Sequence, residues 1–121
     1  MASAAEIGVC GERAAVAYLR SNGFLIREMN WRNGRYEIDI IAERWGVIHF
    51  VEVKSRQSGG WSTPEDAIDG HKFRSLSRAA SLYLAQNAIR WEHQFDLIAV
   101  EMVGQSVVEL RYIENAMQSS W

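Results

Sequence analysis

The sequence predicts a single α/β domain in which helices pack on a mixed β-sheet, with the element order α-β-β-β-α-β-β. Two segments carry apolar residues at helical spacing, and five short runs are rich in β-branched and aromatic residues. A length of 121 residues, with 48% hydrophobic and 23% charged side chains, provides enough apolar material for one core over residues 1–121. No repeat, linker or low-complexity tract divides the chain.

The first helix is indicated by the signals at its two ends. Ser3, with Glu6 three residues later, is a capping-box pattern that predicts a helix over residues 3–20. Asn22 and Gly23 then supply the left-handed conformation at which helices commonly stop.

Three strands are expected next, and the last two of them form a hairpin. Residues 24–29 have the composition of a strand, and the turn-rich segment 30–35 is expected to be a loop. The apolar runs 38–42 and 47–54 are predicted to pair, with residues 43–46 as a four-residue connection.

The second half of the chain completes the α/β pattern. Residues 63–66 (Thr-Pro-Glu-Asp) combine a cap, a proline and early acids, which predicts a helix to about residue 87 with a second start signal at 69–70. Residues 95–100 and 107–113 are typical of two final strands.

Charge and cysteine content exclude several classes of protein. The net charge of −2 argues against a generally basic nucleic-acid binder, although basic side chains can still cluster locally. The single cysteine, Cys10, leaves no internal disulfide and fits a reducing cytoplasm. No apolar run approaches membrane-spanning length and the N-terminus lacks a secretory pattern, so a cytoplasmic protein without membrane association is expected.

The most informative residues are charged side chains inside the two hairpin strands. Asp39 lies within the run 38–42, and Glu52 and Lys54 lie within the run 47–54. Burying an unpaired charge is costly, so this placement indicates a use for the charges. Side chains alternate along a strand, so Glu52 and Lys54 share a face, while His49 points the other way and is expected in the core.

The register of the hairpin decides whether these side chains meet. With a four-residue connection, Glu37 lies opposite Glu52, and Asp39 is a diagonal neighbour of Glu52 at about 7–8 Å between Cα atoms. Glu37, Asp39, Glu52 and Lys54 then project to one side. A two-residue turn keeps this arrangement, whereas a one-residue slip separates Asp39 from Glu52.

A cluster of carboxylates suits a hard cation, so Mg²⁺ or Mn²⁺ is the predicted cofactor. Such an ion completes its shell with water and phosphate, which favours phosphodiester hydrolysis with Lys54 positioning the nucleophile. Glu12, at the margin of the first helix's apolar stripe, is a candidate further ligand, although a solvated boundary glutamate is the interpretation favoured by the sequence. The alternative for the whole cluster is a network of ion pairs on an exposed sheet face.

Asp39 followed by Glu52-Val53-Lys54, with Glu12 on a preceding helix, resembles the PD-(D/E)xK restriction-endonuclease-like superfamily near the Holliday-junction resolvases. The chain to about residue 113 is more closely similar to the YraN-type family of bacterial endonuclease-like proteins. The residues that carry this similarity are Gly11-Glu12-Arg13-Ala14-Ala15, Tyr18-Leu19, Gly23-Phe24, Asn30-Trp31-Arg32, residues 37–42 and 50–56, Lys72, Leu76, Ala80, Tyr83, Leu84 and Phe95-Asp96.

The resemblance implies a restriction-endonuclease-like core in which Glu12, Asp39 and Glu52 bind the metal. It implies that Lys54 is the catalytic lysine and acts together with Asp39 and Glu52. One departure from the family pattern is Tyr36, which stands where the family usually has glycine and therefore affects the backbone beside the site.

The remaining candidates surround this cluster. Glu37 is a candidate to support the metal ligands or to bind the ion weakly, with a solvated rim acid as the alternative. Nucleic-acid contacts are expected from Arg56, just past the catalytic strand, and from Asn30 and Arg32 in the loop 30–35. Lys72 on the second helix is a further candidate, although a solvated helical face is the favoured interpretation there.

Together these features predict a Mg²⁺- or Mn²⁺-dependent endonuclease that acts on DNA, including branched DNA, through its structure. No base-reading helix or zinc module is visible in the sequence. Resolvase-like enzymes cut two strands symmetrically, which makes a homodimer an expectation, and the small size of the chain favours an unidentified protein partner. The alternative is a non-catalytic nucleic-acid-binding or protein-interaction module that retains the nuclease fold.

Overall fold

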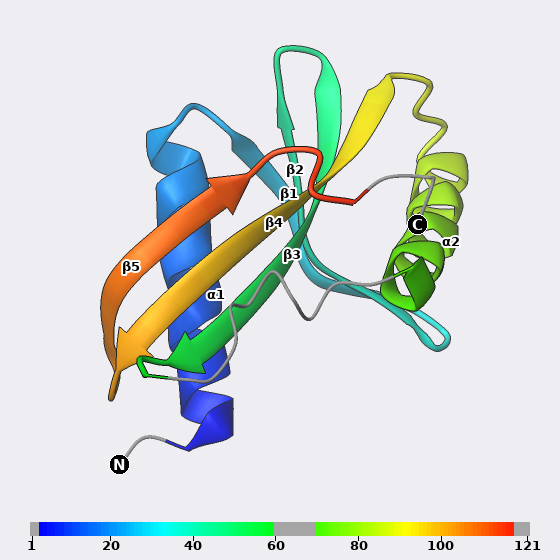
Figure 1. Cartoon of the computed structure of the whole chain (residues 1–121). Coiled ribbons are helices and arrows are strands. Elements are labelled where there is room, and N and C mark those ends of the chain that lie inside the picture. The colour runs from blue at the N-terminus through cyan, green and yellow to red at the C-terminus, as the bar shows by residue number, and fades with distance from the viewer. Residues whose placement is uncertain (1–2, 60–69, 118–121) are drawn as a thin grey trace.

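The computed structural model describes residues 3–59 and 70–117, and its elements follow the predicted order (Figure 1). The elements are α1 (Ala4–Ser21), β1 (Leu25–Asn33), β2 (Tyr36–Arg44), β3 (Val47–Gln57), α2 (Gly70–Gln86), β4 (Glu92–Val103) and β5 (Ser106–Ile113). The strands lie in the sheet in the order β1-β2-β3-β4-β5. Strands β3 and β4 are parallel and the other neighbours are antiparallel, so the sheet is mixed, as predicted.

The sheet separates two apolar cores, one under each helix (Figure 1). On one side Leu19 of α1 packs in a cluster with Val51 of β3. On the other side Tyr83 of α2 packs in a cluster with Phe50 of β3. Adjacent residues of β3 thus serve opposite cores, because side chains alternate along a strand. Within the described residues, neither helix is long and apolar enough to cross a membrane.

Helix α1 starts at the predicted capping box and approaches the sheet closely. The backbone N–H of Glu6 donates to Ser3 Oγ at 3.1 Å, and the N–H of Ser3 donates to Glu6 Oε1 at 3.0 Å. A Cβ atom on Gly11 would lie 1.7 Å from Ser55 Oγ of β3, so only glycine permits this helix–strand distance. The approach brings the next residue, Glu12, toward β3.

The connection between β2 and β3 is shorter than predicted. Trp45 and Gly46 form a two-residue turn with φ values of 55° and 75°, the conformation that favours tight hairpins. Arg44 therefore pairs with Val47, whereas the predicted four-residue connection required Ala42 in that place. The register differs from the prediction by two residues, so the paired residues 40–44 keep their predicted faces.

The loop predicted over residues 30–35 is wrong, because β1 continues through most of it. Trp31 pairs with Ile38, and its ring packs edge-on against Tyr83 of α2 with centroids 5.5 Å apart. These contacts outweigh the turn-forming composition, although Asn30 keeps a positive φ of 51° within β1, and Gly34 and Arg35 form the tight turn to β2. The helix-start signature at 63–66 lies outside the described residues.

Candidate functional site

The regular alternation of side chains along β2 is interrupted at Asp39, next to the residue at which the pairing of β2 with β3 ends. Ile38 and Ile41 both pack in the core under α2, although strict alternation would send them to opposite faces, and Ile40 packs under α1. The pairing of β2 with β3 ends at Ile40. Beyond it, Asp39 Oδ2 accepts a hydrogen bond from the backbone N–H of Val53 at 2.9 Å. The carboxylate is thus held where the two strands separate.

Glu52 is a buried carboxylate that faces two lysines. Lys72 Nζ of α2 lies 2.8 Å from Glu52 Oε2, and Lys54 Nζ lies 3.9 Å from the same atom. Burial lowers the pKa of Lys72, but the hydrogen bond and charge of Glu52 outweigh this effect and raise it. Helix α2 therefore supplies the main counter-ion of Glu52. Lys72, whose side chain is 40% exposed, lies at the carboxylate site and is not only part of a solvated helical face.

The carboxyl groups of Asp39 and Glu52 are in contact. Burial, followed by the hydrogen bond with Glu52 and the charge of Glu52, raises the pKa of Asp39 from 3.8 to about 8, against the opposing effect of the Val53 N–H. Two carboxyl groups this close resist simultaneous ionisation, so Asp39 keeps its proton to a higher pH than a free carboxyl group does. A divalent cation bound between them would offset both charges.

A hollow of about 380 Å³ opens over these side chains between the hairpin and α2. It is lined by Arg35, Glu37, Asp39, Glu52, Val53, Lys54, Lys72 and Ser75. The four residues predicted to share one side of the hairpin, Glu37, Asp39, Glu52 and Lys54, all contribute to this wall. Glu37 lies at its rim, where it forms an exposed ion pair of 3.3 Å with Arg32.

A second hollow of about 330 Å³ lies on the α1 side of the same residues. It is lined by Ala4, Ile7, Gly8, Glu12, Asp39, Val53, Lys54, Ser55 and Arg56. Burial, with the charges of Glu37 and Glu52, raises the pKa of Glu12 against a hydrogen bond from Asn30. Glu12 therefore turns toward the site, in contrast to the solvated position favoured by the sequence.

The predicted three-carboxylate ligand set remains a prediction. Within residues 3–59 and 70–117, no three side chains of the metal-binding types gather closely enough to form a group of ligands. Asp39 and Glu52 are in contact, whereas Glu12 contributes to the adjoining hollow. The two carboxylates in contact are oxygen donors of the kind that Mg²⁺ and Mn²⁺ prefer, and such ions complete their shell with water and phosphate.

The candidate nucleic-acid contacts all lie at the margin of the site. Asn30 and Arg32 belong to β1 rather than to a loop and interact with the site carboxylates Glu12 and Glu37. Arg56 forms an ion pair of 3.1 Å with Glu101. Its Nε and Nη1 atoms are buried and have no hydrogen-bond partner within the described residues. The guanidinium thus keeps donors for an anion in the α1-side hollow.

Two residues of the site were missed by sequence reasoning. Arg35 occupies the tight turn between β1 and β2, and Ser75 lies three residues after Lys72 on α2. The i, i+3 spacing of Lys72 and Ser75 places them on one helix face. That spacing would have identified Ser75 once Lys72 was assigned to the site.

His49 lies in the core, as predicted, within a polar network on the α1 side of the sheet. Its Nδ1 atom is 2.6 Å from Asp96 Oδ2, and the Tyr112 hydroxyl donates to the same oxygen at 2.5 Å. Burial of Asp96 would raise its pKa, but the hydrogen bonds from His49, Tyr112 and Gln94 outweigh burial and lower it. The network links β3, β4 and β5 away from the carboxylate pair.

Comparison with known proteins places the chain in a family. Residues 11–100 match the family described as Uncharacterised protein family UPF0102. A UPF0102 protein of Bacteroides thetaiotaomicron is 43% identical over 100 residues, which are 83% of each chain. A UPF0102 protein of Alkaliphilus oremlandii is 39% identical over 114 residues, which are 92% of this chain and 97% of that one. Since the matches span the site and nearly the whole chain, this protein belongs to the UPF0102 family, the YraN-type family that its sequence resembles.

Proposed function

We propose that this protein is a Mg²⁺- or Mn²⁺-dependent endonuclease that hydrolyses DNA phosphodiester bonds in the cytoplasm. We further propose that DNA structure, including branched junctions, directs it rather than base sequence. The observation that carries the proposal is the contact between the carboxyl groups of Asp39 and Glu52, with Lys54 Nζ 3.9 Å from Glu52. The family description names no activity, so the proposal rests on this site.

Asp39 and Glu52 would hold the metal ion, and Glu12 is the further carboxylate available from the adjoining hollow. When bound, the ion supplies positive charge at the phosphate and lowers the pKa of a bound water. The residues fit such an ion because its positive charge would offset the repulsion from Glu52 that helps to raise the pKa of Asp39.

Three basic side chains of the site would have further roles in the reaction. Lys54 contributes to both hollows and is partly exposed, so its ammonium group can donate to a nucleophilic water or to a phosphate oxygen. Lys72 forms an ion pair with Glu52 and so orients that carboxylate beside Asp39. Arg56 offers its buried N–H groups to a phosphate that enters the α1-side hollow.

The test is cleavage of a labelled panel of duplex, single-strand, flap and four-way-junction DNA in Mn²⁺. The wild type is compared with Lys54→Ala and with Arg20→Ala, which removes an exposed positive charge at the end of α1. We expect cleavage by the wild type and by Arg20→Ala, and its loss in Lys54→Ala. Cleavage that persists in Lys54→Ala would refute the assigned role of the site.

A second function is favoured by two observations. Lys72 already compensates Glu52, and the described residues hold no group of three metal-binding side chains. Both features suit a non-catalytic module that binds nucleic acid or another protein, either as a homodimer or with a different partner. In that case no DNA of the panel is cut, and Asp39→Asn leaves DNA affinity almost unchanged.

A further inference from the structure

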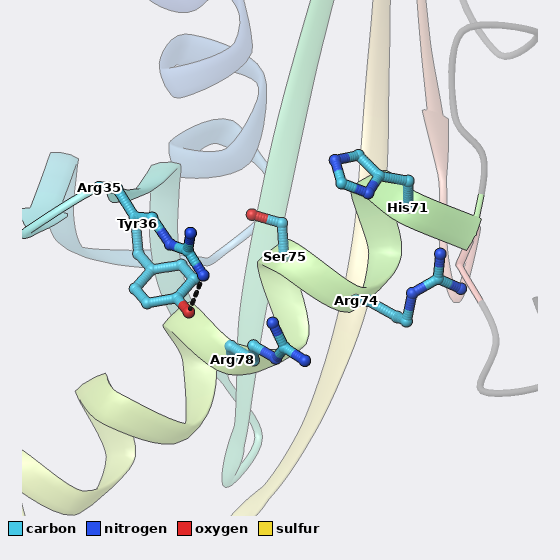
Figure 2. A pocket seen from close by; sticks show the side chains of 6 residues that line it. All are labelled: Arg35, Tyr36, His71, Arg74, Ser75 and Arg78. Atoms are coloured by element: carbon cyan, nitrogen blue, oxygen red, sulfur yellow. Dashed lines mark hydrogen bonds between the residues drawn. The ribbon is translucent and has the colours of Figure 1, made fainter.

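A third hollow, of about 220 Å³, lies beside the carboxylate site and is strongly basic (Figure 2). Arg35 and Tyr36 reach it from the β1–β2 turn and the start of β2, and the other lining residues belong to α2. The full lining is Arg35, Tyr36, His71, Arg74, Ser75 and Arg78. None of these described lining residues is acidic, so the hollow concentrates positive charge.

The arginines here are arranged differently from three arginines on the sheet. Arg27, Arg32 and Arg56 each form an ion pair with a carboxylate. In the basic hollow, by contrast, Arg35 Nη2 donates to the Tyr36 hydroxyl at 3.2 Å (Figure 2). Arg78 hydrogen-bonds to the same hydroxyl, and the two guanidinium groups lower the pKa of Tyr36. A neutral hydroxyl orients these guanidinium groups without cancelling their charge.

The donors of the basic hollow match a phosphate group. Arginine presents planar N–H groups that bind two phosphate oxygens at once, and serine adds a hydroxyl donor. Arg74 and Arg78 are exposed and lie one turn apart on α2, with Ser75 between them. Figure 2 shows Ser75 and Arg78 on the part of α2 nearest Arg35 and Tyr36, and Arg74 farther along the helix near His71.

The basic hollow adjoins the carboxylate site. Arg35 and Ser75 line both the basic hollow and the hollow that contains Asp39 and Glu52. A polymer with regularly spaced phosphates can therefore occupy both at once, which a free phosphate ion cannot. Assuming the proposed function, we propose that the basic hollow binds a backbone phosphate of the strand whose scissile phosphate lies at Asp39 and Glu52.

The test measures binding rather than cleavage, so that it can fail separately from the proposed function. Binding of labelled four-way-junction DNA is followed by fluorescence anisotropy in EDTA between about 50 and 200 mM salt. The variant is Arg74→Gln with Arg78→Gln, and the matched control is Arg20→Gln with Arg90→Gln, which removes two exposed arginines outside the three hollows.

We expect the Arg74/Arg78 double variant to bind about tenfold more weakly at low salt. The slope of log K against log salt should become less steep by about 1 to 2, because one or two phosphate contacts are lost. The Arg20/Arg90 control should match the wild type. Equal slopes and affinities in the wild type and the Arg74/Arg78 variant would overturn the proposal, as would absence of DNA binding by the wild type.

Inorganic phosphate distinguishes a nucleic-acid site from a site for small anions. If phosphate raises the melting temperature of the wild type but not of the Arg74/Arg78 variant, while both bind DNA equally, the backbone assignment is overturned. If the salt slope changes as expected and the wild type does not cut DNA in Mn²⁺, the proposed nuclease activity fails and the phosphate site stands.

Discussion

Replacing Asp39 with asparagine should stabilise the metal-free protein, and the gain should grow as the pH rises. Asparagine keeps an oxygen that accepts the Val53 N–H, so the local backbone is preserved. It removes the charge that Asp39 is reluctant to carry beside Glu52. The substitution therefore isolates the electrostatic repulsion between the two carboxylates.

The magnitude follows from the pKa of Asp39. The folded value of about 8 lies above the value of about 3.9 expected in the unfolded chain, so the protonated form favours folding. This contribution is complete below about pH 4 and is lost as the pH rises through about 8. At about 1.4 kcal/mol per pKa unit, the loss is at most about 5–6 kcal/mol. Electrostatic coupling of Asp39 to Glu52 and partial exposure of Asp39 reduce the expected gain to about 2–3 kcal/mol near pH 9.

Urea unfolding in EDTA, followed by circular dichroism between about pH 5 and pH 9, measures this difference. Glu109→Gln removes an exposed carboxylate of β5 and serves as the control, with no pH-dependent gain. Addition of Mn²⁺ should raise the free energy of unfolding of the wild type and not that of Asp39→Asn. If the difference in the free energy of unfolding between Asp39→Asn and the wild type does not depend on pH, the proposed repulsion between Asp39 and Glu52 is refuted.

Three further substitutions test other parts of the structure. Gly11→Ala should lower the free energy of unfolding by about 1–3 kcal/mol, because the added methyl group overpacks against β3. Gly8→Ala, whose added methyl group meets open space, should raise the free energy of unfolding by about 0.5–1 kcal/mol. Equal effects of the two substitutions in urea unfolding would contradict the close approach of α1 to β3. Lys72→Gln should destabilise the metal-free protein by about 1–2 kcal/mol, because Glu52 loses its counter-ion. For the same reason, Mn²⁺ should raise the melting temperature of this variant by more than that of the wild type. An unchanged rise in melting temperature would count against the pairing of Lys72 with Glu52. Asp96→Asn should cost about 2–4 kcal/mol near neutral pH, and this cost should shrink only in acid, where the wild-type carboxylate is protonated as well.

The sequence predicts the elements of this fold well because its signals are local. The capping box at Ser3 and the alternation around Glu52 each depend on a few neighbouring residues. The sequence leaves a four-residue connection and a two-residue turn both open, because Trp45, a bulky residue at positive φ, gives no turn signal. Face alternation alone also tolerates a register difference of two residues.

The site was predicted only in part, for a related reason. Asp39 and Glu52 stand out because charges inside apolar strands are costly, whatever the tertiary structure. The place of Lys72 depends on how α2 docks beside the hairpin, and the basic hollow depends on Arg35 and Arg78 meeting from separate elements. Such long-range contacts have no signature in the spacing of residues along the chain.

The two-residue turn between β2 and β3 has a consequence for the rate at which the protein folds. A tight hairpin closes in about microseconds, whereas the parallel pairing of β3 with β4 must wait for the long crossover through α2. Asp39 and Glu52 are therefore brought together before Lys72 arrives to compensate Glu52. At alkaline pH, repulsion between the two carboxylates should slow folding, and lower pH or added Mn²⁺ should restore the rate. Stopped-flow refolding rates that change with neither pH nor Mn²⁺ would show that the crossover forms first.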